Sequence, residues 1–204
     1  MDVGAPTLLV PRGSEERAVR RAAPNARIVS IRIGAAAGRN LPQHLDGPLI
    51  LLGLCGALGS LAVGTVVVCE SVTDDVGMCV LSKVPVLKVQ RVRAVTTPNI
   101  VTKASAKRAL AFRSGADVVE MEGTHVARAL VRRGLSCAMV RVVSDGSDTD
   151  LPPLEGAFDG DGNIRPAAVA IALASDPIAA ARFVSEVRRA LRSLGEVART
   201  LSGS

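Results

Sequence analysis

The chain has 204 residues, enough for one domain with a substantial core but too few for two, so we expect a single domain over residues 1–204. Its 48% of hydrophobic and 22% of charged residues are typical of a soluble globular protein. The net charge of +6 would suit nucleic acid, but the arginines are dispersed, no nucleic-acid-binding motif accompanies them, and the aromatic side chains that stack on single strands are almost absent, so no nucleic-acid partner is expected.

The N-terminal half is predicted to contain short strands and one helix. Apolar and β-branched runs indicate strands at residues 7–10, 27–33, 49–52, 63–69, 76–81 and 84–95. A helical pattern covers 14–23, and small residues indicate loops at 34–38 and 53–59. The uncharged stretch 47–69 is long enough to cross a bilayer. Its proline, five glycines and β-branched end favour two buried strands around a Gly-rich loop, so no membrane span is expected.

The C-terminal half is predicted to contain the longer helices. They are expected at 102–113, with Thr102 or Ser105 as the cap, at 122–133, closed by Gly134, and from Asp176 to about Thr200. Strands are predicted at 117–119 and 137–143, and residues 151–165 are expected to be irregular. Because strands alternate with helices and several strands are too apolar to have a solvent face, the sequence predicts an α/β domain with a covered sheet.

The cysteines and the N-terminus indicate the compartment. None of the four cysteines lies in a CxxC pair, and all have apolar neighbours, as expected for buried free thiols in a reducing environment. The N-terminus lacks the basic region and long apolar run of a signal peptide. We therefore expect the protein to be cytoplasmic.

Three segments place polar or small residues where strands of an α/β sheet end, which is where ligands collect in such sheets. The first is the Gly-rich stretch 53–59, in which missing side chains would let a ligand approach the backbone N–H groups. It matches neither the dinucleotide nor the phosphate-loop glycine spacing. A tight turn between two strands explains it equally well.

The second segment is 118–123, a short apolar strand that leads into a helix. Glu120 and Glu122 would share one face of the strand, and Met121 would point the other way. An ionised carboxylate accepts hydrogen bonds from both hydroxyls of a vicinal diol, as ribose binding requires. The alternative is that acidic residues simply favour a helix N-terminus. Glu122 and His125 also form a Glu-x-x-His pair, but the only other histidine is His44, so no metal is expected.

The third segment is 140–148, where a strand ends in the pair Ser144-Asp145. An aspartic acid in a partly apolar pocket can protonate or hydrogen-bond a heterocyclic nitrogen as that group leaves. The alternative is an Asx-type turn that ends the strand. For Asp148 and Asp150 we favour that turn; for Asp145 the residues alone leave both interpretations open.

Together and in this order, the segments resemble the nucleoside phosphorylase and nucleosidase superfamily, which includes the methylthioadenosine/adenosylhomocysteine nucleosidases. The motifs are the Gly-rich turn 53–58 before the strand 63–68, Glu120-Met-Glu-Gly123 at a helix start, and Arg141-Val-Val-Ser-Asp145 at a strand end. The resemblance covers roughly residues 49–148. It implies a central mixed, mostly parallel sheet flanked by helices. It also implies an enzyme that cleaves the N-glycosidic bond of a purine nucleoside by hydrolysis or by phosphorolysis.

The resemblance assigns roles to particular residues. Glu122 would bind the ribose hydroxyls with Met121 packed beside the sugar, and Asp145, placed by Ser144, would protonate the purine N7. A glutamate near the N-terminus would position the attacking water; Glu15 is the candidate, with Glu16 close behind. The remaining substrate contacts would come from Glu120, Cys55, Gly56 and Asn99. No cofactor is expected, phosphate is the candidate co-substrate, and the protein is expected to form a homo-oligomer.

Two departures from the family pattern bear on the substrate. The aromatic residue that stacks on adenine in many members is missing near residues 97–100. The tail after Asp145 is similar to the hopanoid-associated phosphorylase-like branch, which implies an adenosyl-linked lipid beside a methylthioadenosine-type substrate. For phosphorolysis, Arg12, Arg39 and Arg91 are the candidate phosphate ligands. The alternative to an enzyme is a nucleoside-binding protein of the same fold that has lost turnover.

Overall fold

The computed structural model describes residues 5–82 and 87–203 of the chain. The strands in those residues are β1 (Thr7–Pro11), β2 (Arg27–Ile31), β3 (Leu49–Ala57), β4 (Val66–Thr73), β5 (Met78–Val80), β6 (Gln90–Thr96), β7 (Val118–Glu120) and β8 (Cys137–Asp145). The helices are α1 (Ser14–Ala22), α2 (Ala36–Arg39), α3 (Ala104–Ser114), α4 (Gly123–Val131), α5 (Pro166–Ser175) and α6 (Pro177–Ser202).

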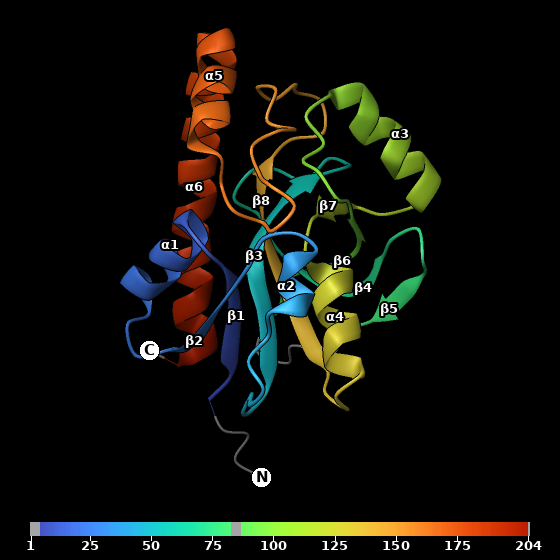
Figure 1. Cartoon of the computed structure of the whole chain (residues 1–204), viewed down its shortest axis with the longest axis vertical. Helices are drawn as coiled ribbons and strands as arrows, with labels where there is room; N and C mark the ends of the chain where they lie inside the picture. Colours follow the sequence, from blue (N-terminus) through green and yellow to red (C-terminus); the bar gives the residue numbers. More distant parts are fainter. Residues whose placement is uncertain (1–4, 83–86, 204) are drawn as a thin grey trace.

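The described strands form one mixed sheet, in which most neighbours run parallel. Its order is β2-β1-β3-β7-β6-β4-β5, and β8 pairs with both β3 and β4. Strands β3, β8, β4, β6 and β7 therefore pair around a closed circuit, from which β1 and β2 extend on one side. The predicted class, an α/β fold with a mixed, mostly parallel sheet between helices, is confirmed (Figure 1).

The period-two alternation of a strand explains the two apolar layers of the core. Leu9 and Met139 pack on one side of the sheet, whereas their chain neighbours Leu8 and Val140 pack on the other. Helices α1 and α6 cover the second side, and α2 and α4 lie against the first (Figure 1). At Gly195 of α6 a Cβ would come within 2.8 Å of a methyl group of α1, so this glycine permits the close helix contact.

Several predicted elements were wrong in detail. Strand β3 continues to Ala57, through the stretch that the glycines had marked as a loop. The predicted loop 34–38 contains the start of α2, and α5 was not predicted at all. Helix α3 begins at Ala104 with no side-chain cap from its own first residues; instead, Asp150 accepts the Ala104 N–H. Residues 84–86 of the predicted strand 84–95 lie outside the described residues.

The two C-terminal helices meet at a sharp bend. Asp176, predicted as a cap, accepts the Ala179 N–H at the start of α6. In the part of the chain that the structure describes, no single helix is long and apolar enough to cross a membrane. Helices α5 and α6 would reach that length and hydropathy only together, and they are bent by 119° relative to each other.

Candidate active site

A cavity of about 240 Å³ lies at the carboxyl ends of several strands of the sheet. Ligand pockets commonly measure roughly 300–1,000 Å³. This cavity lies just below that range, so it has room for no more than one small molecule. Every substrate-contact and proton-transfer residue predicted from the sequence lines the cavity, namely Glu15, Cys55, Gly56, Asn99, Glu120, Met121, Glu122, Ser144 and Asp145. The fold thus brings together residues that are up to 130 positions apart in the chain.

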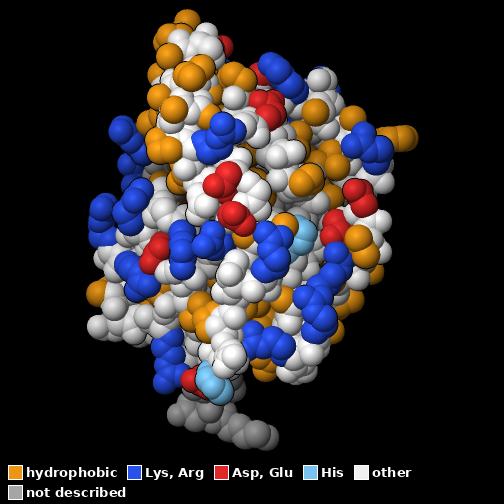
Figure 2. All heavy atoms as spheres, in the orientation of Figure 1, with side chains coloured by type: hydrophobic (Ala, Val, Ile, Leu, Met, Phe, Trp, Pro, Cys, Tyr) orange, Lys and Arg blue, Asp and Glu red, His pale blue; other side chains and the backbone are white. Residues whose placement is uncertain are grey.

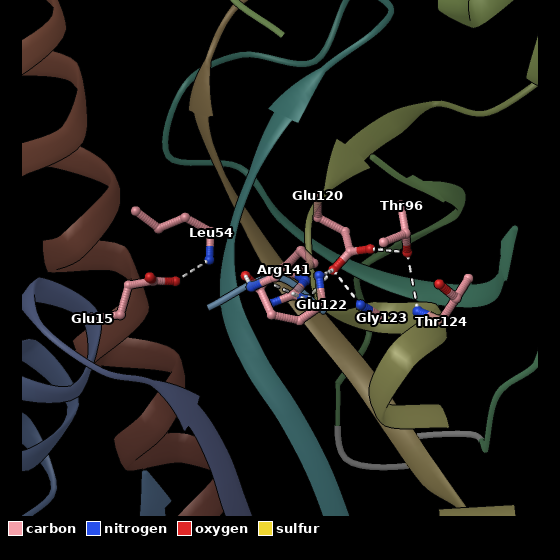
Figure 3. A network of polar contacts seen from close by, with 9 residues as sticks. Glu15, Leu54, Thr96, Glu120, Glu122, Gly123, Thr124 and Arg141 are labelled. Carbon is pink, nitrogen blue, oxygen red and sulfur yellow. Dashed lines mark hydrogen bonds and ion pairs between the residues drawn. The ribbon is translucent and has the colours of Figure 1, made fainter. Parts of the chain in front are cut away.

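One side of the cavity is organised around the fully buried guanidinium of Arg141, on β8 (Figure 3). Its Nη2 donates to the Glu120 carboxylate and lies 3.5 Å from Glu122 Oε2. Its Nε and Nη1 have no hydrogen-bond partner among the described residues. A Cβ at Gly53 would overlap Arg141 Nη1 and come within 2.8 Å of Glu15 Oε1. The glycine in β3 is therefore required by this side-chain cluster.

Glu120 directs both of its oxygens to protein groups. Oε2 accepts the N–H groups of Glu122 and Gly123, at 2.9 and 2.7 Å, and Oε1 accepts the Thr96 hydroxyl at 2.5 Å. These bonds satisfy two backbone donors at the start of α4, as a capping carboxylate does. Glu120 thus fixes Arg141 and Glu122 in place; its predicted contact with substrate stays a prediction.

Glu122 and Glu15 keep free lone pairs beside the cavity. Glu122 Oε1 accepts the Gly34 N–H at 3.0 Å, and Glu15 Oε1 accepts the Leu54 N–H at 2.7 Å. Burial raises the pKa of Glu122 to about 7; Arg141 opposes this shift and Glu120 adds to it. Burial also raises the pKa of Glu15, although the hydrogen bond from the Leu54 N–H and the charge of Arg141 both lower it. The raised pKa makes each of these side chains a better proton acceptor than an ordinary carboxylate.

Of the two neighbouring glutamates Glu15 and Glu16, only Glu15 lies at the cavity. Glu16 accepts hydrogen bonds from Arg20 and Ser30, at 2.8 and 2.5 Å, and does not line the cavity. Glu15 lines it, beside Leu54 at the end of β3. Of the two candidates, the structure therefore places only Glu15 within reach of a ligand.

The cavity lining also contains Asp145, which sequence reasoning identified, and Asp145 is paired with the buried Lys107, which sequence reasoning missed. Lys107 Nζ lies 2.5 Å from Asp145 Oδ2 and 2.5 Å from the Gly146 carbonyl oxygen. Asp145 Oδ1 lies 2.6 Å from the Ser144 hydroxyl. A Cβ at Gly56 would come within 2.8 Å of Asp145 Oδ2, so this glycine admits the carboxylate. In the sequence, Lys107 looks like one more surface cation of an Arg-rich chain.

An apolar wall closes a third side. It consists of Ile100, Leu151, Phe158, Phe183 and Val187, from three separate segments. The two phenylalanines are the aromatic lining of the cavity, and both come from the chain after Asp145 rather than from residues 97–100. No local sequence signal marks them. They are two of only three phenylalanines in the chain, and this scarcity is the one feature of the sequence that could have drawn attention to them.

The arginines considered for phosphate binding do not line the cavity. Arg39 donates to the Gly160 carbonyl and Arg91 pairs with Glu70, both at exposed positions. The described residues also contain no group of three or more His, Cys, Asp or Glu side chains that could hold a metal ion. The charged groups of the site are thus four carboxylates and the buried cations Arg141 and Lys107.

Comparison with known proteins supports the resemblance. Residues 80–175 match the family model described as the phosphorylase superfamily. Among curated proteins, none matches the chain. The 5′-methylthioadenosine/S-adenosyl homocysteine nucleosidase of Helicobacter pylori has a similar structure, with a TM-score of 0.69 and 13% identity over 98% of each chain. The expected likeness to this superfamily is confirmed.

Two further solved structures share the fold. The 5′-methylthioadenosine nucleosidase of Arabidopsis thaliana gives a TM-score of 0.66 at 16% identity, over 97% of this chain and 94% of that one. The futalosine hydrolase of H. pylori gives 0.61 at 14%, over 91% and 97%. At such identities the likeness establishes the fold.

Proposed function

From the nucleosidase fold and the match to the phosphorylase superfamily, we propose that the chain hydrolyses the N-glycosidic bond of a purine nucleoside that carries an apolar 5′ substituent. One observation carries the proposal. One cavity is lined both by carboxylates with raised pKa, Glu15 and Glu122, and by Asp145, which is paired with Lys107. Glycosidic cleavage needs groups of these two kinds on opposite sides of the reacting bond.

On the first side, Glu122 binds the ribose hydroxyls and Glu15 takes the proton of the attacking water. The free lone pairs of Glu122 suit a vicinal diol, which needs one acceptor for each hydroxyl. The unpartnered Nη1 of Arg141, next to Glu15, is a donor that can hold the water oxygen. The same carboxylates stabilise the positive charge that develops on the sugar as the base departs.

On the second side, Asp145 contacts the purine. A proton delivered to N7 turns the base into a neutral leaving group, and general acid catalysis of this kind contributes about 10²–10⁴-fold. Ser144 and Gly56 fix the carboxylate, the first by its hydroxyl and the second by leaving room for it.

The charges around the cavity favour water over phosphate as the nucleophile. The lining has four carboxylates, whereas Arg141 and Lys107 are both already paired with carboxylates. A phosphate dianion would enter a site with an excess of negative charge, and each of the surface arginines considered for it lies elsewhere. Water meets no such repulsion.

The apolar wall supports an apolar 5′ group, either a methylthio group or the start of a lipid chain. The lining phenylalanines would contact such a group, and beyond them Ile171 and Ile178 are exposed on α5 and α6. Figure 2 shows hydrophobic side chains gathered along the upper part of these helices. A cavity of about 240 Å³ cannot enclose a lipid, so a lipid chain would leave along this surface.

Base release tests the proposal. The protein is incubated with methylthioadenosine, adenosine and an adenosine that bears a long 5′-alkyl group, with and without phosphate, and the products are separated by chromatography. We expect free adenine and the free sugar, at rates independent of phosphate and lowest for adenosine. A sugar 1-phosphate would contradict hydrolysis. Tight nucleoside binding without release would instead identify the chain as a binding protein that has lost turnover.

We further propose that the enzyme acts in the cytoplasm, as a single domain without a cofactor, and as a homo-oligomer. The reaction needs only water and the side chains described, and the buried free thiols Cys55, Cys69 and Cys137 suit a reducing compartment. Phe112 on α3 and Met78 and Val80 on β5 are exposed large apolar side chains that a second copy could cover. Analytical ultracentrifugation tests this assembly, and a monomer at micromolar concentration would contradict it.

A further inference from the structure

We propose that Lys107 is a positioning residue that supplies, through Asp145, the proton taken up by the leaving purine. The inference rests on the proposed function, because it concerns the same cavity. It adds a role for a residue that touches neither the sugar nor the base.

The burial of Lys107 calls for an explanation. It is fully buried, whereas the other cations of α3, Arg108 and Arg113, are exposed. A buried ammonium is unfavourable unless it is paired and hydrogen-bonded. Lys107 Nζ has two such partners, the Asp145 carboxylate and the Gly146 carbonyl, each at 2.5 Å. The helix thus delivers one ammonium to the aspartate that faces the base.

Anchoring of α3 does not require this buried charge. The loop after β8 is already tied to the start of α3 by surface contacts. Asp150 accepts the Ala104 N–H at 2.9 Å and the Lys103 ammonium at 3.1 Å, and the Leu151 N–H donates to the Thr102 carbonyl at 2.8 Å. What Lys107 alone provides is a transferable proton at Asp145 Oδ2.

The proton transfer balances over the two sides of the cavity. An N–H bond of Lys107 breaks as an O–H bond forms on Asp145. That O–H bond then breaks as N7–H forms, and the electron pair of the C1′–N9 bond stays with the purine. Lys107 is left as a neutral amine. The proton that water loses when it adds to C1′ passes to Glu15 on the other side, and exchange with solvent restores both groups.

Ser144 is suited to follow this change. Its single hydroxyl hydrogen can point to Asp145 Oδ1, at 2.6 Å, or to the Cys55 carbonyl oxygen, at 3.0 Å, but not to both at once. While Asp145 is a carboxylate, it accepts this hydrogen. While Asp145 carries a proton, the Ser144 hydroxyl can turn to the Cys55 carbonyl. The hydroxyl therefore has an acceptor in both protonation states of Asp145.

A comparison of leaving groups tests the proposal. Methylthioadenosine requires a proton at N7, whereas 4-nitrophenyl β-D-riboside has a leaving group that departs as an anion. We expect Lys107→Met to lower kcat for methylthioadenosine by about 10²–10³-fold and to leave kcat for the nitrophenyl riboside within about threefold. Lys107→Arg, which keeps the charge but cannot give up a proton near neutral pH, should show the same split. Lys103→Met, at the exposed residue just before the same helix, is the matched control and should leave both rates unchanged.

A purely structural role would slow both substrates together, so an equal loss in a variant with a native melting curve would overturn the proposal. So would undiminished adenine release by Lys107→Met. If the unmodified protein releases no base, the proposed function fails, and calorimetry with adenine and 7-deazaadenine then decides on Lys107. We expect about tenfold tighter binding of adenine by the unmodified protein and no such preference in Lys107→Met, since the analogue lacks the N7 that takes the proton. An unchanged preference would contradict the role of Lys107.

Discussion

The two charged sides of the cavity differ in how their charges balance. On the sugar side, Glu15, Glu120 and Glu122 surround the single guanidinium of Arg141. On the base side, one carboxylate, Asp145, meets one ammonium, Lys107. Burial raises the pKa of Glu15 and Glu122, and neighbouring carboxylates add to the shift at Glu122, whereas Asp145 and Lys107 pair one negative with one positive charge. The difference indicates that one side accepts protons and the other gives one.

A single strand sets the distance between the two sides. Arg141 and Asp145 are four residues apart on β8, which corresponds to about 13 Å along an extended strand, and the pairing register with β3 shifts between them. Gly53 and Gly56 of the neighbouring β3 leave the space that each of these side chains needs. The paired strands β3 and β8 thus hold both groups of charged side chains beside one small cavity.

Replacing Arg141 should have the largest effect on stability and activity, because its guanidinium is the counter-ion of Glu15, Glu120 and Glu122. In Arg141→Met three buried carboxylates lose their counter-ion, and we expect the free energy of unfolding to fall by about 3–5 kcal/mol at pH 8, with loss of activity. Urea unfolding measures the change. At pH 5 the loss should be smaller, since Glu122, with a pKa of about 7, is then protonated. Arg91→Met, which breaks an exposed pair with Glu70, should change stability by less than about 1 kcal/mol.

The next effect concerns the base side. Asp145→Asn keeps the shape of the side chain but cannot relay a proton, so kcat for methylthioadenosine should fall by about 10²–10⁴-fold. Steady-state kinetics of adenine release measure it. Asp148→Asn, three residues further along the exposed loop, should leave kcat unchanged. Equal effects of the two substitutions would remove Asp145 from the proposed reaction.

The sequence predicted the residues of the site better than the elements that carry them. Apolar and β-branched runs identified most strands, and two of the three short motifs contained Glu122, Ser144 and Asp145. The glycines of β3 were interpreted as a turn, because the need for them comes from Arg141 and Asp145, which are far away in the chain. Helix α5 was missed because its run of Ala, Val and Ile has no polar face to mark a helical period.

The residues of the site that the sequence did not predict were also missed for one common reason. Lys107, Phe158 and Phe183 act through tertiary contacts that no local pattern encodes. Burial, and not residue type, distinguishes Lys107 from the other cations of α3, Arg108 and Arg113. The phenylalanines reach the cavity only because the irregular segment after β8 and helix α6 pack against it.

A smaller effect is expected from the raised pKa of Glu122. Between the ordinary carboxyl pKa of 4.5 and the folded value of about 7, the folded chain holds a proton that the unfolded chain has lost. Stability should therefore fall as the pH rises through this window, while kcat/KM rises as Glu122 ionises and can accept both ribose hydroxyls. Glu122→Gln should remove both trends and should unfold at pH 8 with a free energy roughly 1–3 kcal/mol above that of the unmodified chain. Urea unfolding and kcat/KM at pH 5–8 measure them; a parallel pH profile in the variant would contradict this assignment.

The smallest effect should come from the apolar wall, which touches neither charged side. Phe183→Ala removes a ring that would contact the 5′ group, so KM for methylthioadenosine should rise by about tenfold, in line with the affinity that an apolar pocket gains from a small group. KM for adenosine, which lacks the methylthio group, should change much less, and kcat should stay the same for both. Phe112→Ala, at a ring 92% exposed on α3, is the matched control and should change neither. If kcat fell as well, the wall would take part in the chemical step; if only KM moves, the two charged sides set the rate and the wall selects the substrate.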